Sequence, residues 1–147
     1  MGSALTSSQA FTAQAPPCAF VADDSEEQRW LVRHMLGALG FEVREQPDGR
    51  ALFWALERAR RAEPELDLLV IADVRMPVYD GLSVLEAWRR ERWPHPFVVM
   101  TGFPDAEVSR RVDVLGGVLL PKPFTLWELG RALARTGHRA ATTTEWA

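Results

Sequence analysis

Six residues of the sequence are of types that together could hold a divalent cation and a phosphoryl group. Each comes at or just after the end of a short apolar run: Asp23, Asp24, Asp73, Thr101, Gly102 and Lys122. Carboxylates that lie close together repel one another unless a positive charge lies among them. An acidic, oxygen-only cluster is what a hard cation such as Mg²⁺ prefers, so the three aspartates are predicted to form a metal site if the fold brings them together.

A phosphoryl group is the natural partner of such a site, because Mg²⁺ usually completes its coordination with water and phosphate oxygens. Lys122 could act as a point charge on phosphate, and the Thr101 hydroxyl could donate a hydrogen bond to it. No Ser–His or Cys–His pair occurs at these positions, so the expected nucleophile is a carboxylate, and Asp73 is the candidate. Taken singly, these residues have plainer interpretations: Asp23 and Asp24 could cap a helix, and Lys122 could lie on the surface.

The elements that must position these residues alternate along the chain. Short apolar runs predict five strands, at 18–22, 41–44, 66–72, 97–100 and 118–120. Amphipathic segments predict five helices. The first begins at Ser25 and is stopped by Gly40, and the second and third are marked by 52–59 and 82–88. The fourth is opened by Pro104-Asp105 and marked by 108–115, and the fifth runs from Thr125 to near Gly137. Five such units with short connections require right-handed crossovers and a parallel sheet covered by helices on both faces, an α/β doubly wound fold. Ligands bind at the carboxyl ends of such strands, where the six polar residues would converge.

Local signals refine this outline. Ser25 with Gln28, and Thr125 with Glu128, have the spacing of capping boxes at two helix starts. Pro121 lacks a backbone donor, which favours an edge position for the last strand. The three histidines are expected to face solvent and to have no role: His34, His95 and His138. Most tryptophans are expected to pack along helices, but several exposed on one face would indicate a partner site.

Length and composition predict one domain of 16–138, with a disordered leader at 1–15 and a short tail at 139–147. The apolar runs are too short to span a bilayer, and no export signal precedes them. One cysteine and a net charge of −3 fit a cytoplasmic protein without general attraction for nucleic acid or membranes. Local arginine clusters fall at predicted helix ends, where they favour the helix dipole.

Four motifs together resemble those of response-regulator receiver domains, the phosphoacceptor modules of two-component signalling. They are Ala22-Asp23-Asp24-Ser25, Asp73-Val74-Arg75-Met76-Pro77 with Asp80-Gly81, Met100-Thr101-Gly102 and Lys122-Pro123-Phe124. Each motif is weak alone, but all occur in the right order and each lies at a strand end. The resemblance covers residues 16–137 and is to the single-domain, chemotaxis-response-regulator-like type.

The resemblance implies a flavodoxin-like (βα)5 sheet of order 2-1-3-4-5. It further implies that Asp73 takes phosphate from a sensor histidine kinase or a histidine phosphotransfer protein. Mg²⁺ would be held directly by Asp24, Asp73 and the Arg75 backbone carbonyl, with Asp23 acting mostly through water. The phosphoryl oxygens would be bound by Thr101, Gly102 and Lys122. The Lys122–Pro123 peptide bond is usually cis in the family. Such a domain is a signalling phosphoacceptor and not an enzyme beyond its own phosphotransfer and dephosphorylation.

One position departs from the family pattern, because Leu119 stands where the family has a switching aromatic residue. Phosphate is still expected to pull Thr101 inward, coupled to a packing shift of Leu119 or to movement of the Phe103–Pro104 loop. Arg75 and Phe103 flank the site and are expected to modulate water access and the lifetime of the phosphate.

The output is predicted to be a downstream protein that binds the surface of 108–115, 118–120 and 125–137, with the receiver a monomer or weak dimer. Two alternatives stay open. The chain could be a receiver cut from a longer transcriptional regulator, or a pseudo-receiver that acts only as an interaction module. An enzyme on the same fold is disfavoured because no glycine-rich turn follows the first strand.

Overall fold

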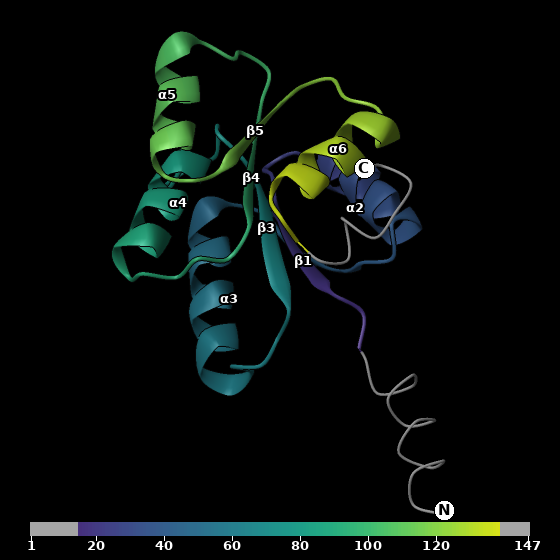
Figure 1. The fold of residues 1–147 in the computed structure, drawn as a ribbon, viewed down its shortest axis with the longest axis vertical. Helices are drawn as coiled ribbons and strands as arrows, with labels where there is room; N and C mark the ends of the chain where they lie inside the picture. The colour runs from purple at the N-terminus through teal and green to yellow at the C-terminus, as the bar shows by residue number, and fades with distance from the viewer. Residues whose placement is uncertain (1–14, 139–147) are drawn as a thin grey trace, which may run out of the picture.

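The computed structural model describes residues 15–138, and these form five strands and five helices (Figure 1). The strands are β1 (Cys18–Ala22), β2 (Glu42–Gln46), β3 (Leu68–Asp73), β4 (Phe97–Thr101) and β5 (Val118–Pro121). The helices are α2 (Glu26–Ala38), α3 (Gly49–Ala62), α4 (Gly81–Arg90), α5 (Ala106–Val114) and α6 (Leu126–Arg135). The predicted leader and tail lie outside the described residues, apart from Ala15. None of the helices within 15–138 is long and apolar enough to cross a bilayer.

All strand pairs are parallel, and the sheet order is β2-β1-β3-β4-β5. Helices α2 and α6 cover one face of the sheet, and α3, α4 and α5 cover the other (Figure 1). The predicted flavodoxin-like architecture is therefore confirmed. Strand β5 lies at the sheet edge, as the proline at its end predicts, since Pro121 pairs only with Thr101 of β4.

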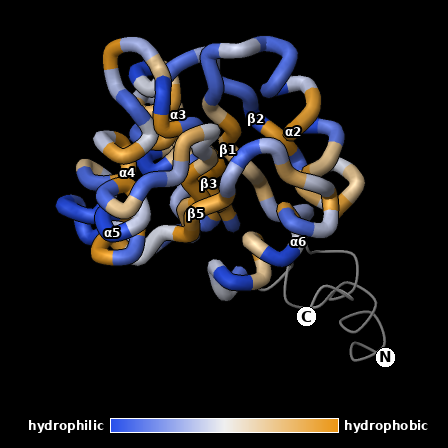
Figure 2. Tube along the Cα trace, turned by 90° about the horizontal axis from the view of Figure 1, so that it is seen from above, coloured by the Kyte–Doolittle hydropathy of each residue, from blue (hydrophilic) through white to orange (hydrophobic). Residues whose placement is uncertain are grey.

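The three central strands are buried on both faces, because helices lie above and below them. Alternate side chains of β1 enter different hydrophobic clusters: Phe20 packs toward α3 and α4, whereas Val21 packs toward α2 and α6. Figure 2 shows the hydrophobic strands β1 and β3 enclosed between the helices. This packing fixes the strand register, and with it the place of each residue at the carboxyl edge.

Short polar side chains start the helices at the same edge. Thr125 and Glu128 form the complete predicted capping box at the start of α6. At α2 only half of the predicted box forms: the Ser25 hydroxyl accepts from the Gln28 N–H. The other half is missing because the Ser25 N–H donates to the carboxylate of Asp23 instead.

The prediction that all three histidines face solvent is wrong for His138. Its side chain is buried, and its Nε2 lies 2.8 Å from Asp67 Oδ1. Gly137 has a positive φ of 80°, which ends α6 and turns the chain back toward the residues that precede β3. Of the others, His34 is exposed as predicted and His95 is half-buried.

Candidate functional site

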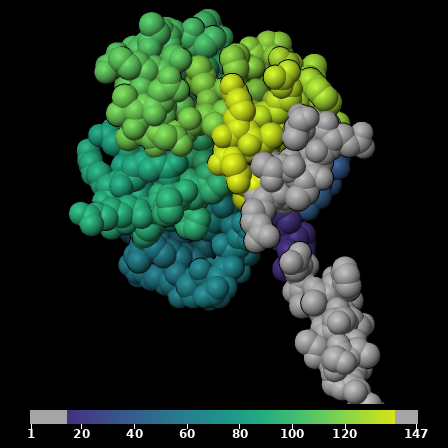
Figure 3. Space-filling view, in the orientation of Figure 1, coloured from purple at the N-terminus to yellow at the C-terminus, as the bar shows by residue number. Residues whose placement is uncertain are grey.

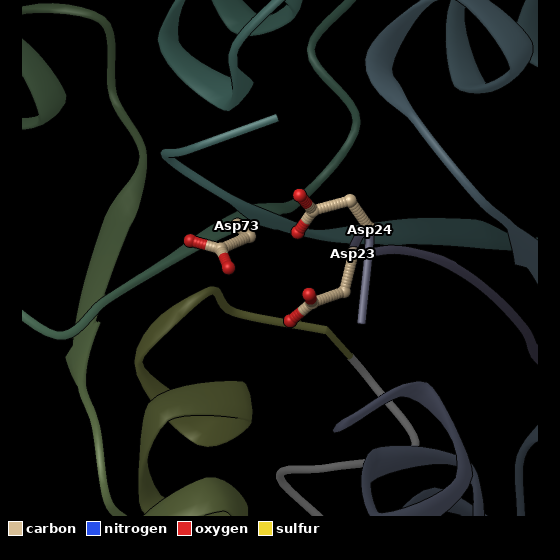
Figure 4. A group of neighbouring side chains, drawn as sticks. All are labelled: Asp23, Asp24 and Asp73. Atoms are coloured by element: carbon tan, nitrogen blue, oxygen red, sulfur yellow. The ribbon is translucent and has the colours of Figure 1, made fainter. Parts of the chain in front are cut away.

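Three aspartates meet at the carboxyl edge of the sheet, where the sequence predicts them. Asp23 and Asp24 follow β1, and Asp73 is the last residue of the neighbouring strand β3. Each offers a carboxylate oxygen, and the three oxygens lie within 4.8 Å of one another (Figure 4). Asp23 and Asp73 are buried while Asp24 is exposed, so the cluster is open to solvent on one side.

Lys122 supplies the positive charge in this cluster. Its Nζ donates to Asp73 Oδ2 at 2.8 Å and to Asp23 Oδ2 at 2.9 Å. Burial by itself would lower the pKa of Lys122, but the hydrogen bonds and charges of the two carboxylates outweigh it and raise the pKa above its ordinary value. The side chain is therefore an ammonium ion throughout the neutral range. Lys122 is the only lysine among the 17 lysines and arginines of the sequence, a signal for this residue that the motifs do not contain.

The donor set fits a hard divalent cation. Backbone N–H groups of Ser25 and Arg75 already hold one oxygen each of Asp23 and Asp73, which orients these carboxylates. Within 15–138, the carboxylate of Asp24 makes no hydrogen bond and stays available as a ligand. Three carboxylates against one ammonium leave an excess of negative charge on oxygen, the chemistry that hard cations require.

Thr101 ends β4, on the other side of Asp73, and Gly102 follows it. Thr101 is buried, and its Oγ1 accepts the N–H of Phe103 at 3.1 Å. An added Cβ on Gly102 would meet no atom within 4 Å, so this part of the rim is open. The Lys122–Pro123 bond is cis, as the resemblance implies, and the Lys122 N–H donates to the Thr101 carbonyl at 2.7 Å.

Gly81, which the sequence shows only as part of a motif, holds the loop after β3 against the acceptor strand. A Cβ on Gly81 would overlap the backbone carbonyl of Asp73. Its N–H also donates to the Val74 carbonyl at 3.1 Å, and Asp80 caps α4 through the N–H of Ser83. The close approach of α4 to β3 therefore depends on glycine at this position.

Arg75 and Phe103 meet across the mouth of the site. The Arg75 guanidinium carbon lies 4.6 Å from the centre of the Phe103 ring, a cation–π contact. The sequence placed both residues beside the site, but nothing in it indicated that they touch. They come from the loops after β3 and β4, which neighbour each other in the sheet.

A doubly wound parallel sheet with a lysine-bridged acidic cluster at its carboxyl edge belongs to the class of α/β proteins that bind ligands at the ends of their strands. The comparison with known families narrows this class. The model of the response regulator receiver domain matches residues 19–134, and the chain belongs to this family. It is thus a receiver domain of a two-component response regulator, a signalling domain and not a conventional enzyme.

Similar proteins include both long and short regulators. The transcriptional regulatory protein FixJ of Bradyrhizobium diazoefficiens is 34% identical over 71% of this chain and 49% of its own length. The transcriptional regulator NtrC of Salmonella typhimurium is 29% identical over 74% of this chain and 22% of its own length. The chain therefore spans half or less of these relatives. The structure of chemotaxis response regulator CheY4 of Vibrio cholerae is similar with a TM-score of 0.71 and 29% identity, over 83% of this chain and 99% of that one.

Proposed function

We propose that Asp73 accepts a phosphoryl group from a phosphohistidine, carried in the cytoplasm by a sensor histidine kinase or a histidine phosphotransfer protein. The observation that supports this best is the position of Lys122, whose Nζ lies 2.8 Å from the acceptor carboxylate. An ammonium ion at that place neutralises the charge that arrives with a phosphoryl group. The acceptor is shielded but reachable, since Asp73 is 8% exposed.

Mg²⁺ is the cation that we assign to the acidic cluster, held by Asp23, Asp24, Asp73 and the backbone carbonyl of Arg75. When bound, it would neutralise charge on the phosphoryl oxygens during transfer. The three carboxylates fit this assignment because all their ligand atoms are oxygen and they carry more charge than Lys122 offsets.

In the transfer, an oxygen of Asp73 forms a bond to phosphorus while the bond from phosphorus to the histidine nitrogen breaks, and the imidazole keeps the electron pair. The Thr101 hydroxyl, the Gly102 N–H and the Lys122 ammonium hold the phosphoryl oxygens. Reversal of the signal requires water to attack phosphorus, with the Asp73 carboxylate as the leaving group. Transfer and hydrolysis thus both occur on this one side chain.

The kinase would dock where α2 and α6 begin, next to the site. Trp30 and Leu31 of α2 are 56% and 41% exposed, and Trp127 of α6 is 51% exposed. Both helices cover the same face of the sheet. An apolar rim beside a charged centre is what a transient protein partner needs.

The output surface that we propose consists of α5, β5 and α6, which adjoin on one side of the molecule (Figure 3). Val114 at the end of α5 is 75% exposed. A downstream protein would bind this surface without direct contact to nucleic acid, and the receiver would be a monomer or weak dimer. In a longer regulator of the FixJ kind, the same surface would contact an output domain instead.

The test is phosphorylation with Mg²⁺ and a small phosphodonor such as acetyl phosphate, read by intact mass. The parent should gain one phosphoryl group, and Asp73→Asn should gain none. Asp80→Asn is the matched control, because the exposed cap of α4 lies in the same loop and asparagine caps equally well. Modification of Asp73→Asn to the parent extent would refute the assignment and favour a pseudo-receiver.

A further inference from the structure

Strand β5 offers no aromatic side chain to report a movement of Thr101. Leu119 is half-buried and packs against the core on the side of α3, α4 and α5. The end of β5 is joined to Thr101 through the backbone, by the hydrogen bond from the Lys122 N–H to the Thr101 carbonyl. A signal carried by the Thr101 side chain therefore needs another way out of the site.

Two matching hydrogen bonds lead from the site to one pair of side chains. The Arg75 N–H donates to Asp73 Oδ1 at 3.1 Å, and the Phe103 N–H donates to Thr101 Oγ1 at 3.1 Å. The side chains of these two donors then contact each other, with the guanidinium 4.6 Å from the ring centre. Acceptor, arginine, ring and hydroxyl thus form one continuous series of contacts, from Asp73 to Thr101.

This pair is poised to separate. Arg75 is exposed and has no carboxylate partner among residues 15–138, and Phe103 is 67% exposed. A cation–π contact at an exposed site is weak, whereas a guanidinium bound to phosphate oxygens makes strong, charge-assisted hydrogen bonds. A phosphoryl group on Asp73 would offer such oxygens close to Arg75.

We infer that the Arg75–Phe103 contact carries the phosphorylation signal out of the site, in place of an aromatic residue on β5. This inference rests on the proposed function. The Thr101 hydroxyl moves to donate to a phosphoryl oxygen. The Phe103 backbone moves with it, because the Phe103 N–H is hydrogen-bonded to Thr101 Oγ1. Arg75 exchanges the ring for the phosphoryl group, and Phe103 is released three residues before α5 begins, at the edge of the output surface.

The experiment uses the full chain with Mg²⁺ and beryllofluoride, a phosphoryl mimic. Adduct formation is followed by fluorine NMR, and the loop by hydrogen exchange of peptides that cover 102–114. The Nε–H signal of Arg75 is assigned by its absence in Arg75→Gln. In the parent we expect the Nε–H proton of Arg75 to lose its ring-current shift when the adduct forms. We also expect the rate of hydrogen exchange in 102–114 to change.

Phe103→Leu removes the ring and keeps an apolar side chain of similar size. Because Phe103 is exposed, we expect this variant to fold as the parent does. We expect this variant to form the adduct as the parent does, but with the exchange response of 102–114 reduced to less than about half. Tyr79→Leu is the matched control, since Tyr79 is also an exposed ring near the site, and it should respond as the parent does.

The inference is overturned if Phe103→Leu responds fully, or if the Arg75 Nε–H signal of the parent does not shift while the adduct forms. A parent that forms no adduct overturns the proposed function itself, so the two failures are distinguishable.

Discussion

Replacing Lys122 with methionine should strip the acidic cluster of its built-in cation. Lys122→Met keeps the length of the side chain but leaves Asp23 and Asp73 facing each other without a positive charge. Removal of one partner from a buried ion pair costs about 3–5 kcal/mol of folding free energy. Here the Lys122 side chain is 18% exposed and both aspartates keep a backbone donor, so we expect a loss of about 2–4 kcal/mol.

The assay is urea unfolding with EDTA present, compared with the same titration in Mg²⁺. In the variant a bound cation no longer competes with the ammonium for Asp23 and Asp73. Magnesium should therefore stabilise Lys122→Met more than it stabilises the parent, and the gap between the two proteins should narrow. About tenfold tighter binding would account for roughly 1.4 kcal/mol of that recovery.

A matched control is Arg44→Met, which breaks the exposed ion pair between Arg44 of β2 and Glu63. This variant should be stabilised by Mg²⁺ as much as the parent is. Adding Asp23→Asn to Lys122→Met should restore part of the lost stability, since the remaining carboxylates repel less. Equal unfolding midpoints for Lys122→Met and the parent in EDTA would refute the reasoning, as would equal stabilisation by Mg²⁺.

Three further outcomes follow from local features. Val78 is 72% exposed and has a φ of 71°, which costs a β-branched residue about 1–2 kcal/mol, so Val78→Asn should raise the free energy of unfolding by about 1 kcal/mol in urea titrations. Gly81→Ala should lower it by about 2–4 kcal/mol and slow phosphorylation from acetyl phosphate, because the new Cβ overlaps the carbonyl of Asp73. Burial, and then the charge of Arg89, lowers the pKa of His95 from 6.5, so its contribution to stability is full above that pH and is lost as the pH falls through the lower folded-state pKa. Thermal unfolding midpoints of His95→Gln should therefore fall less than those of the parent below about pH 6.5.

Much of the fold could be predicted because its signals are local. Apolar runs and capping residues marked the strands and helices, and parallel strands bring their ends together at one edge. The order of the strands did not follow from periodicity, since it depends on which strand pairs with which; it came from the family motifs. The contact of buried His138 with exposed Asp67 was missed because it joins residues 71 positions apart, and no local pattern encodes it.

The site could be predicted in its members but not in its internal contacts. Asp73 and Thr101 end their strands and Lys122 follows one, which is enough to place them together. The packing of Gly81 on the Asp73 carbonyl and the contact of Arg75 with Phe103 depend on the precise approach of two loops. The spacing of residues along the sequence does not encode how closely these two loops approach each other.

The solitary lysine has a practical consequence for chemical labelling. The other 16 of the 17 lysine and arginine side chains are guanidinium groups, which do not react with succinimidyl esters or reductive methylation reagents. Those reagents therefore meet two amines, the chain terminus and the one in the acidic cluster. Methylation with a carbon-13 label would then give a single side-chain resonance, placed between Asp23 and Asp73. Each occupant of the pocket could be followed by that resonance alone, without isotopic enrichment of the protein.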